Sequence, residues 1–274
     1  MKKNKEELIQ ISKQIRKDIV EVSRESASGH PGGSLSAADI VTTLFFNELS
    51  INPENPKDEN RDRFVLSKGH AAPVLYSALA RRGFFDPKEL MTLRKIGSDL
   101  QGHPNMNDLP GIDMSTGSLG QGISAAVGMA LAGKVDKKDY RVYALLGDGE
   151  LEEGQVWEAS MCAAHYNLDN LTIFIDFNGL QIDGDITKVM SPCPIDKKFE
   201  AFGWNVLVID GHNYDEILGA IEKAKNHKGE PTAIICNTVK GKGVSFMENE
   251  ASWHGTAPSK EQCEVAVKEL GGEI

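Results

Sequence analysis

The stretch YRVYALLGDGELEEGQVWEASMCAAHYNLDNLTIFIDFN, residues 140–178, decides the fold. It holds two apolar runs separated by a helical pattern, and its length is that of one strand–helix–strand crossover. Both runs are apolar almost throughout instead of alternating, which is typical of parallel strands covered by helices on both faces. The stretch therefore predicts an α/β fold with a parallel central sheet flanked by helices.

The rest of the chain fits one such domain over residues 1–274, with a tail of loop and short helix from about residue 241. Apolar positions at helical spacing, or in continuous runs, predict its other elements. We expect helices over residues 5–26, 35–49, 86–96 and 214–227, strands over 61–66, 205–211 and 231–239, and a turn at 68–70 that leads into a further helix. Glycine and proline in SGHPGG are expected to end the first helix.

Composition and charge exclude several classes of function. The formal net charge is −10 and the lysines and arginines are scattered, so a nucleic-acid partner is not expected. No apolar run reaches the length of a membrane span, and the charged N-terminus lacks a secretory signal. The four cysteines show no paired spacing, which indicates reduced thiols. We expect a soluble cytoplasmic protein.

The loop GDGELEEG, residues 147–154, combines glycines suited to a diphosphate with four acidic side chains. Asp148 follows the first predicted strand of the crossover and Asn178 follows the second, and parallel strands bring both to the same edge of the sheet. A carboxylate and an amide oxygen are hard ligands that suit Mg²⁺, with Ca²⁺ or Mn²⁺ as alternatives. Asp148 is therefore predicted to hold a cation, and the cation to hold a diphosphate.

Gly147 and Gly149 would let the backbone approach that diphosphate, and a helix expected from Leu151 would point its free N–H groups at it. Glu150 and Glu152 are interpreted as favourable charges in the first turn of that helix. A dinucleotide fingerprint is disfavoured, because the third glycine of GDGELEEG is at the wrong spacing and GSLGQG does not follow a strand.

GDG followed by Asn178 in DFNGLQIDG resembles the thiamine diphosphate signature. Further motifs along nearly the whole chain are similar to transketolase: SGHPGG, VLSKGHAAPVLY, QGHPN, STGSLGQGISAAVGMA, GDGELEEGQVWEA, VKGKGVSF and SWHGTAP. The chain resembles the N-terminal, diphosphate-binding domain of that family. This resemblance implies the thiamine diphosphate-binding fold and ketol transfer between sugars, as in the pentose phosphate pathway.

The resemblance also implies roles for individual residues. The Mg²⁺ ligands are matched by Asp148, Asn178 and the carbonyl of Leu180. Contacts with the cofactor are implied for His70, Gly117, Ser118, Leu119, Gly149, Asn178, Lys68 and Lys240. Catalytic or substrate-facing roles are implied for His30, His103, His254 and Glu153. Glu153 resembles an acid that reaches across a subunit contact.

Four histidines lie beside glycines and are expected in turns that project into a cleft: His30, His70, His103 and His254. Any one of them alone would be interpreted as a solvated loop histidine, and only the group of four beside a cation loop favours function. Neutral imidazoles can exchange protons with a ketose carbonyl and its hydroxyls. His165 and His227 are interpreted as structural, and His212 as a cap or turn residue.

Family members continue beyond the tail of this chain, and the glutamate that faces the aminopyrimidine ring comes from a separate pyrimidine-binding domain. Only one α/β domain is predicted here, so we expect a split enzyme. A C-terminal transketolase subunit would supply the pyrimidine-binding and C-terminal domains, in an α₂β₂ heterotetramer that acts on sugar phosphates. Four alternatives stay open: a split enzyme for a modified or sulfonated sugar, a decarboxylating relative, a non-catalytic scaffold subunit, and a fragment of a longer chain.

Overall fold

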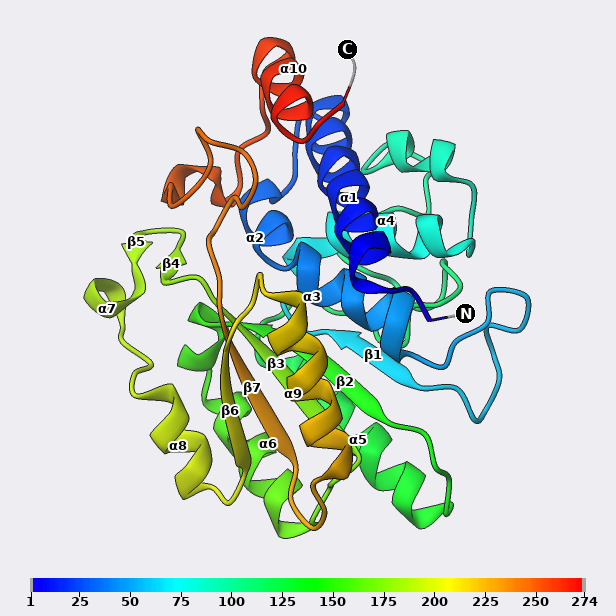
Figure 1. Cartoon of the computed structure of the whole chain (residues 1–274), viewed down its shortest axis with the longest axis vertical. Coiled ribbons are helices and arrows are strands. Elements are labelled where there is room, and N and C mark those ends of the chain that lie inside the picture. The colour runs from blue at the N-terminus through cyan, green and yellow to red at the C-terminus, as the bar shows by residue number, and fades with distance from the viewer. Residues whose placement is uncertain (1, 273–274) are drawn as a thin grey trace.

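The computed structural model describes residues 2–272 and places a five-stranded sheet at the centre of the chain (Figure 1). The strands run in the order β1-β2-β3-β7-β6, and every neighbouring pair is parallel. Their bounds are β1 (Arg63–Leu66), β2 (Val142–Gly147), β3 (Leu171–Phe177), β6 (Asn205–Asp210) and β7 (Thr232–Asn237). The predicted parallel α/β sheet is confirmed.

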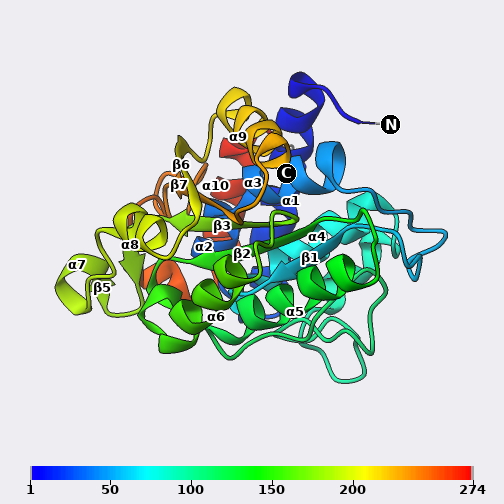
Figure 2. The same ribbon diagram turned by 90° about the horizontal axis from the view of Figure 1, so that it is seen from below.

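Helices cover both faces of this sheet, and Figure 2 shows the resulting three layers from below. One face packs against α5 (Gln121–Val135), α6 (Gly154–His165) and α8 (Ile195–Ala201). The other face packs against α1 (Lys5–Glu25), α3 (Ala38–Thr43), α4 (Ala72–Arg82) and α9 (Tyr214–Asn226). The sheet therefore separates two hydrophobic cores.

Strand β2 shows how the sequence produces these layers. Tyr143 and Leu145 enter the core under α1 and α4, whereas Val142, Ala144 and Leu146 enter the core under α5 and α6. Because successive side chains of a strand point to opposite faces, a strand covered on both faces is apolar at every position. The edge strand β6 is less covered, and its Val208 is 57% exposed.

Three predicted helices differ from the structure. The helix expected over residues 35–49 is broken into α2 (Pro31–Ser36), α3 and a π-helical turn η1 (Leu44–Glu48). Pro31 is the first residue of α2, a position at which proline is well tolerated because its missing N–H would have no helical partner there. The helix expected over 86–96 is only a 3₁₀ segment, η3 (Pro87–Thr92), and Arg94 beyond it has a left-handed φ of 59°. The third difference, at Leu151, concerns the site.

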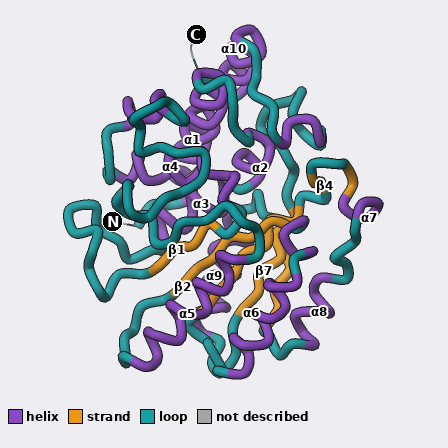
Figure 3. The backbone as a smooth tube through the Cα atoms, turned by 180° about the vertical axis from the view of Figure 1, so that it is seen from behind, coloured by secondary structure: helices purple, strands orange, loops and turns teal. Residues whose placement is uncertain are grey.

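The remaining elements are short, apart from the last helix. They are η2 (Gly69–Ala71), η4 (Gly149–Glu152), β4 (Leu180–Gln181), β5 (Gly184–Asp185), α7 (Ile186–Val189), η5 (Ala251–His254) and α10 (Lys260–Glu269). Figure 3 shows the β4–β5 hairpin and α7 standing away from the central strands. In contrast, α10 packs beside α1, so the predicted tail helix joins the core (Figure 1).

Two findings bear on the expectations from composition. All four cysteines are free thiols, as their spacing indicates. Within residues 2–272, no helix has the length and apolar character needed to cross a bilayer.

Candidate active site

A cavity of about 240 Å³ opens at the carboxyl ends of the strands, around the loops that follow β1, β2 and β3. Its lining includes eleven predicted site residues: His30, Lys68, His70, Gly117, Leu119, Asp148, Gly149, Asn178, Leu180, Lys240 and His254. Ligands of open α/β sheets bind at this edge. The structure therefore brings together residues that are spread over more than 200 positions of the sequence.

The oxygen atoms predicted to hold a cation lie at this edge. Gly147 of β2 and Asp176 of β3 are partners in the parallel register, so Asp148 and Asn178 leave the sheet on the same side. The carboxylate of Asp148 is 3% exposed and accepts hydrogen bonds from Gly149 N (2.8 Å) and Gly179 N (2.6 Å). Burial, together with the nearby charge of Asp176, raises the pKa of Asp148 to about 6.

This donor set fits a hard divalent cation. Asp148 forms no ion pair within residues 2–272, and the same part of the chain holds no cluster of three or more His, Cys, Asp or Glu side chains suited to a metal. The oxygen atoms at this edge are the Asp148 carboxylate, the Asn178 amide oxygen, which accepts from Leu180 N at 3.2 Å, and the Leu180 carbonyl, which accepts from the Lys240 ammonium at 3.0 Å. Such a set suits magnesium or calcium and not zinc.

The loop after Asp148 differs from the prediction. Residues Gly149–Glu152 form the 3₁₀ segment η4, and α6 begins only at Gly154. The N–H of Leu151 donates to the carbonyl of Asp148 at 3.1 Å, so it is not free to bind a phosphate. The expectation of a helix starting near Leu151 is wrong, because the glycine-rich loop first closes a tight turn on itself.

Glu150 has a different role from the one that its position in the sequence indicates. Its carboxylate is 2% exposed and accepts hydrogen bonds from Ser67 Oγ, Gly120 N (2.9 Å) and Gly147 N (3.1 Å). Burial raises the pKa of Glu150 despite these bonds. Glu150 does lie in the first turn of a helical segment, η4, but its buried carboxylate also ties together the loops after β1 and β2 and the one before α5.

Asp176, which was not predicted as a site residue, is fully buried and contacts the cavity-lining residue Lys68. It pairs with the ammonium of Lys68 and accepts hydrogen bonds from Ser36 Oγ (2.5 Å) and Thr238 Oγ1. Burial alone would raise the pKa of Asp176, but the charge of Lys68 and these bonds hold it below its usual range. The signal in the sequence is an acid within the otherwise apolar run LTIFIDF.

Four histidines gather at the mouth of the cavity. The ring centroid of His30 lies 5.2 Å from that of His70, 5.5 Å from that of His254 and 6.5 Å from that of His103. His70 and His254 stack at 5.1 Å with an interplanar angle of 27°. Burial lowers the pKa of His30 to about 4, with the Arg94 charge adding to it, and burial and Lys240 lower the pKa of His254 to about 3. These imidazoles are therefore neutral at pH 7.

Lys240 connects the cation edge to the histidines. Its Nζ donates to the carbonyl of Leu180 (3.0 Å) and lies 3.0 Å from His254 Nδ1. Burial, with the repulsion of Lys68, lowers the pKa of Lys240 to about 8. Because an ammonium only donates, His254 Nδ1 is the acceptor while Lys240 is charged, and the ring proton of His254 lies on Nε2.

Three predicted residues lie outside the cavity lining. His103 is exposed at the rim near His30, and Ser118 is exposed in the loop that carries Gly117. Glu153 is exposed at the start of α6, beside Gly120. The roles predicted for these three side chains stay predictions.

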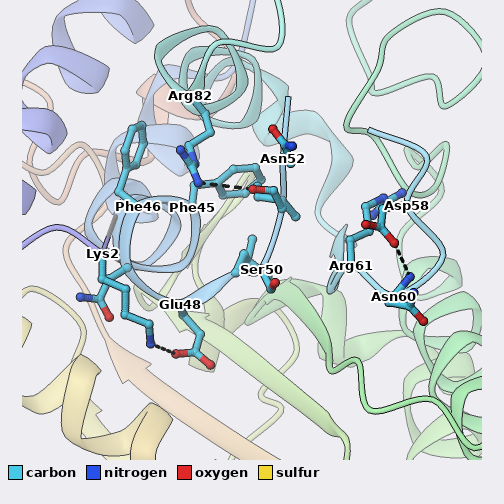
Figure 4. A pocket seen from close by; sticks show the side chains of 13 residues that line it. Lys2, Phe45, Phe46, Glu48, Ser50, Asn52, Asp58, Asn60, Arg61 and Arg82 are labelled. Carbon is cyan, nitrogen blue, oxygen red and sulfur yellow. Dashed lines mark hydrogen bonds and ion pairs between the residues drawn. The ribbon is translucent and has the colours of Figure 1, made fainter. Parts of the chain in front are cut away.

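A second cavity, of about 460 Å³, lies near the amino end of β1, and Figure 4 shows Glu48, Ser50 and Arg82 among its side chains. Its charges are largely paired within the protein: Lys2 lies 3.6 Å from Glu48, and Arg61 pairs with Asp113. None of the predicted site residues lines it. We therefore place the candidate active site at the carboxyl edge of the sheet.

The fold and this edge define a cofactor-binding α/β domain, and comparisons with known proteins place it more closely. The family model described as "Transketolase, thiamine diphosphate binding domain" matches residues 5–273. A 6-deoxy-6-sulfo-D-fructose transketolase subunit of Clostridium sp. (strain MSTE9) is 48% identical over 94% of both chains. An apulose-4-phosphate transketolase subunit of Phocaeicola vulgatus is 43% identical over 96% of this chain and 93% of its own length.

Longer relatives match over part of their length. Transketolase of Homo sapiens is 45% identical over 95% of this chain and 41% of its own. The crystal structure of transketolase from Campylobacter jejuni has a TM-score of 0.93 and 36% identity, covering 99% of this chain and 44% of that one. The chain belongs to the transketolase family, and it spans less than half the length of these two relatives. The predicted resemblance is confirmed.

Proposed function

We propose that this chain is the diphosphate-binding subunit of a split, thiamine diphosphate-dependent transketolase. The enzyme would transfer a two-carbon ketol unit from a ketose phosphate to an aldose phosphate. One observation carries the proposal: the oxygen ligands of Asp148, Asn178 and Leu180 share a cavity with three neutral histidines. The two relatives named as transketolase subunits, which match along nearly their whole length, support the division of the enzyme into two chains.

The cation edge supports binding of thiamine diphosphate with Mg²⁺. Asp148 is a buried carboxylate without a cationic partner in the described chain, and a divalent ion beside it would neutralise both the carboxylate and the diphosphate. Lys240 adds positive charge at the same edge. When bound, the cofactor supplies the nucleophilic carbon that cleaves the ketose C–C bond. The chain contributes the binding, the orientation and the proton carriers.

The histidines support recognition of a polyhydroxylated substrate. His30 Nδ1 is buried and has no hydrogen-bond partner within the described residues, although buried polar atoms are normally paired. His254 carries its proton on Nε2 while Lys240 occupies Nδ1, so it can donate to a sugar oxygen. A neutral imidazole of this kind can give a proton to a carbonyl oxygen and later take one from a hydroxyl.

The relatives named as transketolase subunits support a partner subunit, because each of them matches this chain along nearly its whole length. A second polypeptide would supply the pyrimidine-binding and C-terminal domains, in the α₂β₂ assembly predicted above. Glu153 stands exposed at the start of α6, where a contact across a subunit boundary could reach it.

The test is an assay of ketol transfer from a ketose phosphate with this chain alone, the partner alone and the two mixed. We expect activity only in the mixture. Full activity of this chain alone would contradict the split, and an inactive mixture would contradict ketol transfer from a ketose phosphate. Thiamine diphosphate titrations with and without Mg²⁺ separate an enzyme subunit from a scaffold, because a scaffold should bind neither.

A sulfonated sugar is the second candidate substrate, because one relative at 48% identity is named for 6-deoxy-6-sulfo-D-fructose. The mixed subunits should be assayed with fructose 6-phosphate and with 6-deoxy-6-sulfofructose under the same conditions. A kcat/KM for the sulfonate about tenfold or more above that for the phosphate, which corresponds to ~1.4 kcal/mol, would favour this candidate. The opposite ratio would exclude it.

A further inference from the structure

A buried charged cluster lies beside the candidate active site and outside its cavity. Arg16 of α1 forms a bidentate ion pair with Asp39 of α3: Nη1 donates to Oδ1 at 2.9 Å and Nη2 donates to Oδ2 at 2.6 Å. His212, which follows β6, places Nδ1 at 2.8 Å from Asp39 Oδ2, and Tyr214 OH donates to Asp39 Oδ1 at 2.7 Å. Asp39 is only 4% exposed. The interpretation of His212 as a cap or turn residue therefore leaves out its buried contacts.

The position of the proton on His212 follows from its two neighbours. The backbone N–H of Val239 points at His212 Nε2, with a separation of 2.9 Å. A backbone N–H can only donate, so Nε2 is the unprotonated acceptor and the ring proton lies on Nδ1, facing Asp39. Burial alone would raise the pKa of Asp39, but Arg16 and the bonds from His212 and Tyr214 hold it well below its usual range. Asp39 is therefore an ionised acceptor for that proton.

The bond to Val239 fixes the backbone just before Lys240. On the other side of Lys240, Arg16 Nε donates to the carbonyl of Lys242 at 3.1 Å. Between them, Gly241 N donates to the carbonyl of Gly32 at 3.0 Å. A Cβ at Gly241 would lie 2.3 Å from a backbone oxygen, so the segment has no room to move toward that side. Lys240 is thus held at both ends while its ammonium reaches the Leu180 carbonyl.

We propose that His212 is a positioning residue for the active site. Asp39 and Arg16 fix its tautomer, His212 holds Val239 through Nε2, and the held backbone aims Lys240 at the edge where the cofactor's diphosphate would lie. The functional consequence rests on the proposed function, whereas the contact itself does not. This chain of contacts runs from α1 through α3 and the loop after β6 to the loop after β7.

Two substitutions of His212 distinguish the contact of Nδ1 with Asp39 from the contact of Nε2 with Val239. His212→Asn keeps a donor near the place of Nδ1, facing Asp39, and removes the acceptor for Val239. His212→Gln is longer and can place an amide oxygen near the place of Nε2, so it restores that acceptor. His227→Asn, at a histidine whose contact with Glu230 is on the surface, serves as the matched control.

The first readouts use the full chain without cofactor. We expect amide exchange at Val239 to be about tenfold faster in His212→Asn and close to wild type in His212→Gln and His227→Asn. Nitrogen NMR of the wild-type chain should show His212 protonated at Nδ1. A proton on Nε2, or equal exchange in the Asn and Gln variants, would overturn the proposal, and the wild-type tautomer decides it even if a variant does not fold.

The second readout uses the chain mixed with its partner subunit. We expect His212→Asn to weaken thiamine diphosphate binding in the presence of Mg²⁺ by about tenfold and to lower kcat, with little change in the KM for the ketose. His212→Gln should recover most of both losses. Equal losses in the two variants would indicate a general structural role and contradict the proposal. If the wild-type mixture shows no ketol transfer, the proposed function fails while the exchange and the tautomer still decide the role of His212.

Discussion

Lys68, which lines the cavity, and Asp176 form a buried ion pair, and neither side chain is more than 2% exposed. Lys68 follows β1 and Asp176 belongs to β3, so the pair spans the end of the intervening strand β2. Lys68 Nζ also donates to the carbonyl of Gly33 at 2.8 Å. The pair therefore joins three parts of the site, and its loss should affect stability as well as binding.

Asp176→Asn should destabilise the chain by about 3–5 kcal/mol, because it leaves the ammonium of Lys68 buried without a counter-charge. Urea unfolding followed by circular dichroism measures the change. Glu200→Gln is the matched control, since Glu200 pairs with Lys197 on the surface and should contribute less than about 1 kcal/mol. A change below about 1 kcal/mol for Asp176→Asn would show that the pair does not stabilise the fold.

Asp148→Ala should abolish metal-dependent binding of thiamine diphosphate, because it removes the one charged ligand of the predicted cation. Calorimetric titration of the mixed subunits with thiamine diphosphate and Mg²⁺ provides the measurement, with an expected loss of affinity of at least about a hundredfold. Glu152→Gln is the control, because Glu152 lies in the same loop but bonds Gln181 on the surface. Unchanged affinity in Asp148→Ala would refute the metal role.

His254→Ala should spare cofactor binding and lower turnover by about 10²–10⁴-fold, as expected when a proton carrier is removed. The comparison is between the dissociation constant of thiamine diphosphate and the kcat for ketol transfer, measured on the same preparation. His227→Ala, outside the cavity, should change neither value. A variant that no longer binds the cofactor would assign His254 to the cofactor site.

His30 should make stability depend on pH. Its pKa is lowered from 6.5 to about 4 by burial and by the charge of Arg94, so below pH 6.5 the unfolded chain binds a proton that the folded chain does not. This contribution is complete above pH 6.5 and is lost as the pH falls toward 4. The unfolding free energy should be measured between pH 4.5 and 8. Its slope against pH reports the number of protons bound on unfolding, and this number should be smaller by up to about one in His30→Gln than in the wild type.

The comparison of His30→Gln with the wild type contains its own control. Above about pH 7.5 the ring is neutral in both states, so the difference between the two chains should not vary with pH. Parallel curves over the whole range would show that His30 is as easily protonated in the folded chain as in the unfolded one.

The cation edge was predictable because it depends on local pattern and one topological rule. Apolar runs at 142–147 and 171–177 predict buried strands, and the helical crossover between them is a connection that joins parallel strands. Asp148 and Asn178 then reach the same edge wherever the other strands lie. The motifs that resemble transketolase added the four turn histidines, which pattern alone would have left as loop residues.

Other features could not be predicted because they depend on contacts between distant segments. Glu150 looks like any acid at a helix start until Ser67 and Gly120 are placed around it. His212 follows a strand in an ordinary glycine turn, and its partners Asp39 and Val239 are 173 and 27 positions away. The helix expected over residues 35–49 is divided among α2, α3 and η1, and the first of these begins earlier, at Pro31.

The sequence by itself determined the strands, their parallel direction and the identity of the oxygen ligands. These features depend on the apolar pattern of each strand and on one helical crossover, all within about forty residues. The tertiary structure alone decided which charges are buried together. Whether Lys68 meets Asp176, Glu150 meets the loop before α5, or His212 meets Val239 is fixed only when separate loops pack at one edge of the sheet. Burial then removes water as the alternative partner, so each of these polar groups must find its partner within the protein.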